Sequence, residues 1–150
     1  MKLCLVCSSG GHLLELRSLN DLWSRYDRCW VTFPTMDTRF LLSGERVYWA
    51  HRPTTRNIPN FFRNLAVAFR VLPRERPDVI VSTGAGVAVP FFYLGRALGM
   101  TTVYLESLTR SRDLSLTGRL VYPVASRFLV QWPELAARFP RKVRFEGQIL

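Results

Sequence analysis

Short apolar runs alternate with longer stretches of mixed polarity along the whole chain. The runs are rich in Val, Ile, Leu and aromatic residues, which is typical of strands buried on both faces of a parallel sheet. We predict seven strands, at residues 2–7, 29–33, 46–49, 78–82, 102–105, 127–131 and 143–145.

Between these runs, apolar residues recur at the spacing of a helix face. The helices predicted from this spacing cover residues 11–24, 37–42, 57–74, 87–98, 115–124 and 133–139. Strands alternating with helices are typical of an α/β fold built on a Rossmann-like, doubly wound parallel sheet. Since no repeat or linker interrupts the pattern, we expect a single domain over residues 1–150.

The first junction between a strand and a helix carries Ser9, Gly10, Gly11 and His12. The glycine pair allows a tight turn whose N–H groups approach a ligand closely, and the following helix directs the positive end of its dipole into the loop. An anionic group, above all a phosphate, fits this arrangement. A plain Gly-rich turn without a ligand is the alternative.

Two later junctions emerge at the same edge of the sheet, where ligands bind in such folds. One carries Gly84, Ala85 and Gly86, which form either a wall of the ligand cleft or a plain turn. The other carries Glu106, which either shares chemistry with His12 or caps a helix or joins an ion pair. Together the three junctions predict a cleft that contains a histidine and a carboxylate.

The net charge of the chain indicates which classes of ligand it can bind. The formal net charge is +10, and nearly all of it comes from arginine, whose planar guanidinium binds phosphate and carboxylate groups through paired N–H donors. Nucleic acid, acidic lipid headgroups and diphosphate ligands are therefore the candidate partners.

The cysteines and histidines do not have the spacing of a metal site. Cys4 and Cys7 spell C-x-x-C, but residues three apart in a strand face opposite sides of the sheet. We interpret both, with Cys29, as reduced core residues of a cytoplasmic protein. His51 follows the third strand in a polar stretch and is expected to be exposed in a loop, so we expect no bound metal.

The glycine loop also argues against two common reactions of this fold. Hydride transfer from a dinucleotide requires G-x-G-x-x-G and an acidic residue at the end of the second strand, and the sequence has neither. Phosphoryl transfer by a P-loop requires a lysine and a hydroxyl residue after the loop, where two leucines stand instead. What remains is group transfer with a stabilised diphosphate and one acid–base residue.

Several motifs follow one another in a fixed order. They are Ser9-Gly10-Gly11-His12 with Glu15, Gly84-Ala85-Gly86 with Pro90, Glu106-Ser107-Leu108-Thr109-Arg110, Leu114-Ser115-Leu116-Thr117-Gly118, Val130-Gln131-Trp132-Pro133-Glu134-Leu135 and Gly147. In this order they resemble the accessory subunits of the eukaryotic two-protein UDP-N-acetylglucosamine transferase, which adds the second sugar to the dolichol-linked oligosaccharide. They equally resemble the bacterial subunits that build capsule and exopolysaccharide repeat units on a polyprenyl diphosphate. The resemblance is least clear over residues 37–74.

The resemblance implies a GT-B glycosyltransferase divided between two chains. This chain would be the N-terminal, acceptor-side half, and a separate donor-binding subunit of the C-terminal type would hold most of the UDP-sugar. The implied enzyme is an inverting UDP-sugar glycosyltransferase that is inactive without its partner and needs no cofactor besides the UDP-sugar co-substrate. Its acceptor would be a polyprenyl-diphosphate-linked saccharide.

An inverting transfer requires a base near the acceptor hydroxyl. The positive helix end beside His12 favours a neutral imidazole, so His12 is the expected catalytic base. Glu106 is the alternative base, or it orients His12 or the acceptor, while Glu15 is expected to complement the helix dipole. The residues expected to bind the phosphate or the substrate are Ser9, Gly10, Gly11, Gly84, Ala85, Gly86 and Arg110.

After the last strand the chain ends in a glycine turn followed by Ile149 and Leu150. A single-chain enzyme of the implied type would cross into its second domain at this point. Burial of a large apolar side chain contributes roughly 1.5–3 kcal/mol, so we expect Ile149 and Leu150 to pack against the donor-binding subunit. Folding back onto the sheet of this chain is the alternative.

Residues 57–74 combine aromatic and basic side chains in one helix, with Phe61, Phe62, Leu65 and Phe69 among arginines. Either this helix lies on a membrane surface, or its aromatic residues face the sheet. The chain opens on a strand, without a leader, and no apolar run is long enough to span a bilayer. We therefore expect a cytoplasmic protein attached peripherally to the cytoplasmic face of a membrane.

Two other classes of protein share some of these features. A stand-alone nucleotide- or phosphate-binding Rossmann protein would keep the glycine loops without a partner subunit. A basic nucleic-acid-binding domain would explain the charge, but the arginines are spread along the chain and no recognition-helix or RNP signature accompanies them. We therefore expect no nucleic acid partner.

Overall fold

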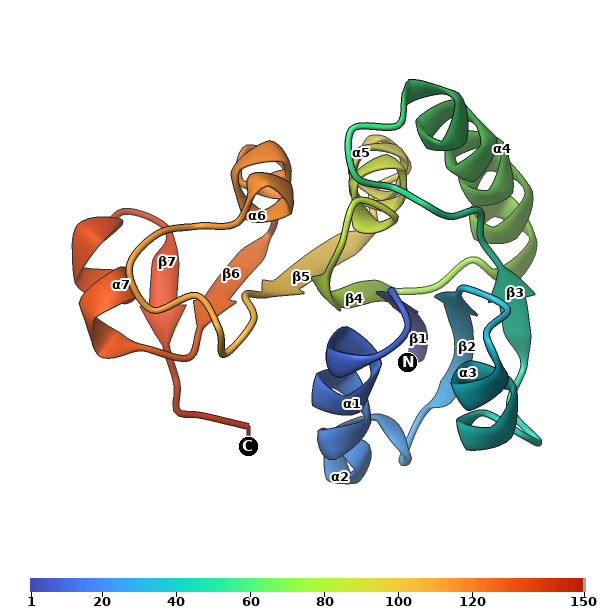
Figure 1. Cartoon of the computed structure of the whole chain (residues 1–150), viewed down its shortest axis with the longest axis horizontal. Helices are drawn as coiled ribbons and strands as arrows, with labels where there is room; N and C mark the ends of the chain where they lie inside the picture. The colour runs from blue at the N-terminus through green and yellow to red at the C-terminus, as the bar shows by residue number, and fades with distance from the viewer. Residues whose placement is uncertain (150) are drawn as a thin grey trace.

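The computed structural model describes residues 1–149 and contains one parallel sheet of seven strands (Figure 1). The strand order is β3-β2-β1-β4-β5-β6-β7. All seven predicted strands are confirmed, with ends that agree to within two residues. Their bounds are β1 (Lys2–Cys7), β2 (Asp27–Thr32), β3 (Val47–Trp49), β4 (Val79–Gly84), β5 (Thr101–Leu105), β6 (Arg127–Val130) and β7 (Val143–Phe145).

Helices lie on both sides of the sheet (Figure 1). The first three, α1, α2 and α3, pack on one face, and the other four pack on the opposite face. This is the doubly wound α/β arrangement that the sequence predicts. The bounds are α1 (Gly11–Ser18), α2 (Asn20–Trp23), α3 (Met36–Leu41), α4 (Ile58–Glu75), α5 (Ala88–Ala97), α6 (Leu116–Val121) and α7 (Pro133–Arg138).

The prediction of one continuous helix over residues 11–24 is wrong, because this segment forms two separate helices, α1 and α2. The hydroxyl of Ser18 donates to the carbonyl of Glu15 (2.6 Å), and the indole N–H of Trp23 donates to the carbonyl of Leu16 (2.9 Å). These side-chain donors compete for carbonyls that a continuous helix would use for its own N–H groups. Sequence periodicity does not reveal this competition.

Two apolar layers, one on each side of the sheet, form the core. Cys4 and Cys29 lie in the layer under α4 to α7, whereas Cys7 lies in the layer under α1 to α3. The prediction that Cys4 and Cys7 face opposite sides of the sheet is therefore confirmed, and all three cysteines are free and buried. Burial raises the pKa of the Cys7 thiol to about 12, so this thiol stays protonated at neutral pH.

The helices cover the sheet unequally. Within residues 1–149, no helix covers β5 and β6 on the side that carries α1 and α2 (Figure 1). Val103 and Leu129 are half-buried on this side and line a groove of about 400 Å³ together with residues 146–149. An apolar sheet face is thus left partly open to solvent.

The long helix α4 turns its aromatic residues away from the sheet. Its buried apolar face consists of Val67, Ala68, Val71 and Leu72, while Phe61, Phe62 and Phe69 are exposed. The alternative in which the aromatic residues face the sheet is therefore wrong. None of the helices in residues 1–149 combines the length and the apolar character needed to cross a bilayer.

Two buried asparagines of α4 hold the β3–α4 loop in place. The side chain of Asn64 accepts from the N–H of His51 (2.7 Å) and donates to its carbonyl (3.0 Å), while Asn60 donates to the carbonyl of Pro53 (2.8 Å). The side chain of His51 is exposed, as predicted. The loop is therefore fixed through its backbone rather than through its side chains.

We expect Asn64→Ala to lower the free energy of unfolding by about 1–3 kcal/mol, because two backbone groups lose their buried partner. Amide exchange at His51 should accelerate as well. Arg70→Ala, an exposed change on the same helix, is the control and should stay within about 0.5 kcal/mol. Equal denaturation midpoints for the two variants would show that Asn64 does not hold the loop.

Candidate functional site

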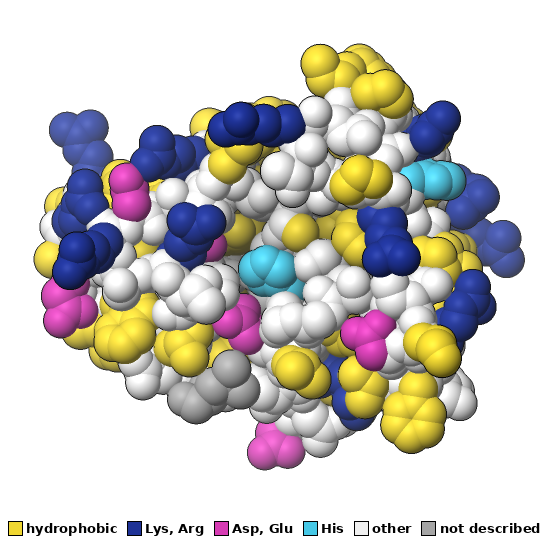
Figure 2. Space-filling model, in the orientation of Figure 1, with side chains coloured by type: hydrophobic (Ala, Val, Ile, Leu, Met, Phe, Trp, Pro, Cys, Tyr) yellow, Lys and Arg dark blue, Asp and Glu magenta, His cyan; other side chains and the backbone are white. Residues whose placement is uncertain are grey.

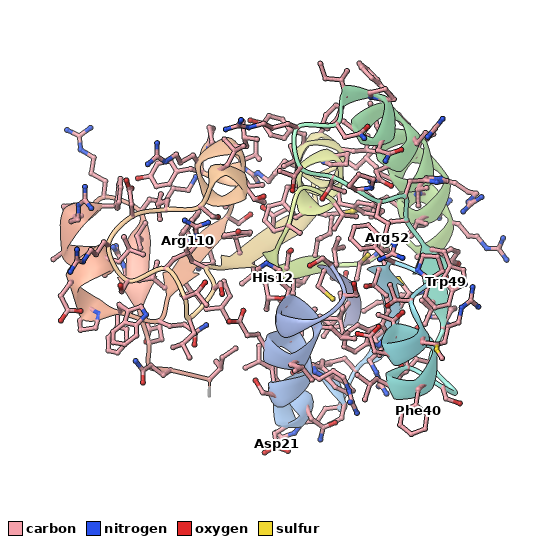
Figure 3. All side chains as sticks on the ribbon, viewed as in Figure 1. His12, Asp21, Phe40, Trp49, Arg52 and Arg110 are labelled. Atoms are coloured by element: carbon pink, nitrogen blue, oxygen red, sulfur yellow. The ribbon has the colours of Figure 1, made fainter. Side chains whose placement is uncertain are left out.

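Loops that follow β1, β3, β4 and β5 enclose a cleft of about 810 Å³ at the carboxyl edge of the sheet. The strand order reverses between β1 and β4, so the cleft lies at the topological switch point, where folds of this kind bind ligands. Figure 3 shows His12 near the centre of this edge, with Arg110 beside it. Figure 2, in the same orientation, shows a hollow there with a histidine exposed at its floor.

His12 is the second residue of α1, and its imidazole packs against Gly84. A Cβ atom at position 84 would lie 2.7 Å from Cε1 and 2.9 Å from Nδ1 of His12, and Gly84 has a φ of +134°. The hydroxyl of Thr83 donates to the carbonyl of His12 (2.6 Å) and ties the start of α1 to β4. Glycine at position 84 is therefore required for the imidazole to occupy this place.

The sequence predicts that Glu15 complements the dipole of α1. In the structure Glu15 is instead buried and connects α1 to the β5–α6 loop. Its Oε1 accepts from the hydroxyl of Ser107 (2.9 Å) and from the N–H of Leu108 (3.0 Å), and its Oε2 lies 3.8 Å from Nδ1 of His12. Burial raises the pKa of Glu15, but the neighbouring imidazole and the two hydrogen-bond donors outweigh burial and hold the pKa below its usual value. Glu15 is therefore ionised at neutral pH.

Glu106 also lines the cleft, and both of its oxygens are occupied. Oε2 accepts from the N–H and the hydroxyl of Ser115 (both 2.9 Å), and Oε1 accepts from the N–H of Ser107 (3.1 Å) and the hydroxyl of Tyr104 (3.4 Å). Ser115 is in turn the N-cap of α6. These contacts match the alternative in which Glu106 supports a helix start, and they leave neither oxygen free to take a proton.

Of the residues predicted to bind phosphate or substrate, four line the cleft: Gly11, Ala85, Gly86 and Arg110. Gly84 lies beneath His12, and Gly10 allows the turn into α1 with a φ of +76°. The carbonyl of Ser9 accepts from the hydroxyl of Ser8 (3.3 Å).

A carboxylate already stands at the glycine turn. The pKa of Asp37 is held below its usual value by a hydrogen bond from the hydroxyl of Thr35 and by backbone N–H groups that include that of Gly10.

One wall of the cleft is not predicted from the sequence. It is formed by the β3–α4 loop and the first turn of α4, and α6 adds Leu116 and Leu120 opposite. The sequence feature that could have predicted this wall is the polar segment after the third strand, which emerges at the edge where ligands bind. The additional lining residues of this wall are Thr54, Thr55, Arg56, Asn57, Ile58 and Phe61.

The two residues predicted to contact a partner lie at the end of the chain. Ile149 is half-buried, lines the open apolar groove and donates its N–H to Oε1 of Gln131 (3.2 Å). It therefore lies against the sheet of this chain while bordering an apolar surface that is partly open. Leu150 lies outside the described residues.

Solved structures share this fold at low sequence identity. MurG of Acinetobacter baumannii superposes with a TM-score of 0.78 and 17% identity, and this chain is covered completely while 46% of that chain is covered. A UDP-GlcNAc 2-epimerase of Methanocaldococcus jannaschii gives a TM-score of 0.75 with 18% identity over 99% of this chain and 46% of that chain. The α/β fold with its seven-stranded parallel sheet therefore matches the N-terminal half of GT-B enzymes, and the chain spans about half the length of these two proteins.

Two similar proteins carry the same name. A protein of Eremothecium gossypii called UDP-N-acetylglucosamine transferase subunit ALG14 is 40% identical over 100 residues, which are 59% of this chain and 44% of the relative. The human protein of the same name is 28% identical over 181 aligned positions that cover all of this chain and 83% of the relative. Residues 41–149 match the family model for Oligosaccharide biosynthesis protein Alg14 like, and so this chain belongs to the Alg14-like family.

Proposed function

We propose that this chain is the acceptor-side subunit of a divided UDP-N-acetylglucosamine transferase and acts on a polyprenyl-diphosphate-linked saccharide. The name of the relatives supports both the donor and the existence of a partner subunit. The name also supports the division, because the human relative, of which this chain covers 83%, is itself called a subunit. The cleft supports this function best, because it combines a histidine with arginines and an apolar wall.

The cleft lining combines two kinds of side chain that suit such an acceptor. His12, Arg56 and Arg110 are polar lining residues, and the two guanidinium groups can neutralise a diphosphate. Ile58 and Phe61 of α4 lie at an apolar part of the lining, together with leucines of α6. A saccharide diphosphate with the first units of a lipid tail fits this division of the lining.

His12 acts as the base in the proposed reaction. The acceptor hydroxyl loses its proton to the imidazole as its oxygen bonds to the anomeric carbon, and the bond from that carbon to the diphosphate breaks, so UDP leaves with the electron pair. Attack on the face opposite the leaving group inverts the anomeric centre. Glu106 holds the start of α6, and with it the apolar wall, in place.

We expect His12→Ala to lower kcat by about 10²- to 10⁴-fold in the complex with the donor-binding subunit, because the general base is lost. The assay uses UDP-N-acetylglucosamine with a polyprenyl-diphosphate-linked N-acetylglucosamine, and His51→Ala is the matched control. Glu106→Ala should reduce both transfer and the melting temperature. Near-normal turnover of His12→Ala would overturn the assignment of His12 as the base.

We propose further that α4 attaches the protein peripherally to a membrane. Phe61 is 37% exposed and Phe62 is 60% exposed at the start of α4, beside the apolar part of the cleft. Figure 2 shows hydrophobic side chains projecting at the top of the molecule, over the N-terminal end of α4 in Figure 1. Exposed Arg63 and Arg70 on the same helix suit acidic headgroups, so the cleft would open toward the lipid that carries the acceptor.

A double variant, Phe61→Ser with Phe62→Ser, should lose most of its binding to vesicles that contain phosphatidylserine, as measured by co-sedimentation. Binding of the unchanged protein should weaken at high salt, because the arginines contribute through screened charge. Phe40→Ser, at an aromatic residue of α3 that is 81% exposed, is the control and should bind normally. Equal partition of the unchanged protein into neutral and anionic vesicles would contradict membrane docking through α4.

We propose that the donor-binding subunit covers the open groove beside the C-terminal residues. The groove is lined by strand residues such as Val103 and Leu129 and by Ile149, and apolar surface of this kind gains free energy when a partner covers it. In this arrangement Ile149 lies between the sheet and the partner, and Leu150 contacts the partner. Because the donor site lies on the other subunit, this chain alone is inactive.

Deletion of residues 148–150 should leave a folded protein that binds the donor-binding subunit at least tenfold more weakly and supports correspondingly less transfer. Circular dichroism checks the fold, and titration calorimetry with the purified partner measures the affinity. Leu98→Ser removes an exposed apolar side chain just after α5 and should leave the affinity unchanged. An unchanged affinity of the truncated chain would show that the C-terminal residues do not contact the partner.

A further inference from the structure

Two buried polar atoms face each other at the floor of the cleft without a hydrogen bond. They are Nδ1 of His12 and Oε2 of Glu15, which lie 3.8 Å apart. Among residues 1–149, only Arg28 and Thr32 also bury a side-chain nitrogen or oxygen that has no partner. A buried polar atom without a partner destabilises a fold, so a facing pair of such atoms is an unusual arrangement that points to a contact made during function.

Glu15 is held firmly in this position. Its Oε1 accepts from the hydroxyl of Ser107 and the N–H of Leu108, both on the loop after β5, and the side chain is 6% exposed. The hydroxyl of Ser107 lies 3.1 Å from that of Thr109, which further limits the movement of this loop. One oxygen of a fixed, ionised carboxylate is therefore left directed at the imidazole.

The imidazole is oriented so that its two nitrogens have different surroundings. Its side chain is 32% exposed and lines the cleft, while Nδ1 is buried toward Glu15. Gly84 beneath the ring leaves no space for the imidazole to move toward β4. Nε2 is therefore the nitrogen that remains for a ligand in the cleft.

We propose that Glu15 is a positioning residue that accepts the Nδ1–H of His12 and so keeps Nε2 unprotonated and directed at the acceptor hydroxyl. The observed 3.8 Å is longer than a hydrogen bond, and a small rotation of the imidazole closes it. This role rests on the proposed function, in which His12 is the base. Glu106 does not take this role, because both of its oxygens are already occupied.

The carboxylate contributes to the proposed transfer in two ways. It selects the tautomer in which the lone pair of Nε2 can take the proton of the acceptor hydroxyl while the new bond to the anomeric carbon forms and UDP departs. It then stabilises the imidazolium that results, because a negative charge lies next to the new positive charge. The other charged groups that line the cleft are Arg56, Glu106 and Arg110, and these stay unchanged when Glu15 is replaced.

The chain has only two histidines, so the tautomer of His12 can be read directly by ¹⁵N nuclear magnetic resonance of the full chain. His51→Gln assigns the signals, and in other samples the exposed His51 is an internal reference. We expect Nδ1 to carry the proton of neutral His12. In Glu15→Gln the amide N–H₂ can donate to Nδ1, so the proton of neutral His12 should move to Nε2.

The matched control is Glu134→Gln, at an exposed carboxylate on α7, which should leave the tautomer of His12 unchanged. Neutral His12 with its proton on Nε2 in the unchanged protein would overturn the proposal, even where Glu15→Gln does not fold. An unchanged tautomer in a folded Glu15→Gln would overturn it as well. Neither measurement requires transferase activity, so failure of the proposed function is recognised separately.

Turnover in the complex gives a second readout. Glu15→Gln should lower kcat by about 10²- to 10⁴-fold with little change in KM for the UDP-sugar, because base catalysis and not donor binding is affected. The acidic limb of the profile of kcat/KM against pH should move to lower pH, since loss of the carboxylate removes stabilisation of the imidazolium. A rise in KM with an unchanged kcat and an unmoved limb would indicate a merely structural role.

Discussion

The whole site depends on the fact that all seven strands run parallel. Every loop that follows a strand must then emerge at one edge, and the reversal of strand order between β1 and β4 opens a cleft between neighbouring loops. Residues as distant in sequence as His12, Gly84 and Glu106 meet there for this reason alone. The packing of His12 against Gly84 refines an arrangement that the topology already fixes.

The two faces of the sheet differ in a way that suits a subunit. Helices α4 to α7 cover one face, whereas α1 to α3 leave β5 and β6 open on the other within the described residues. The open face is apolar and carries the C-terminal residues, while the aromatic residues of α4 point outward near the cleft. A membrane on α4 and a partner on the groove would therefore approach from different sides of the molecule.

Features that depend on the local sequence pattern are predicted correctly. Features that depend on contacts between residues far apart in the sequence are not. All seven strands follow from apolar runs, and the cleft follows from the residues that end them. The burial of Glu15 is not predictable in this way, because its partner Ser107 is 92 positions away. The break after α1 depends on a side-chain donor from Trp23, and the fixed β3–α4 loop depends on Asn64, whose role is hidden in the buried face of α4.

Two carboxylates, those of Glu106 and Glu15, line the cleft. They differ in the number of hydrogen-bond donors around them, and this difference indicates different roles. Glu106 meets four donors and thereby fixes the start of α6, so its lone pairs are committed to structure. Glu15 meets two donors on one oxygen and keeps the other directed at His12. A carboxylate buried with spare acceptor capacity beside an imidazole is less stable than one that is fully bonded. That instability is relieved when His12 turns its Nδ1–H to Glu15, which is also the orientation that exposes a basic nitrogen to the cleft.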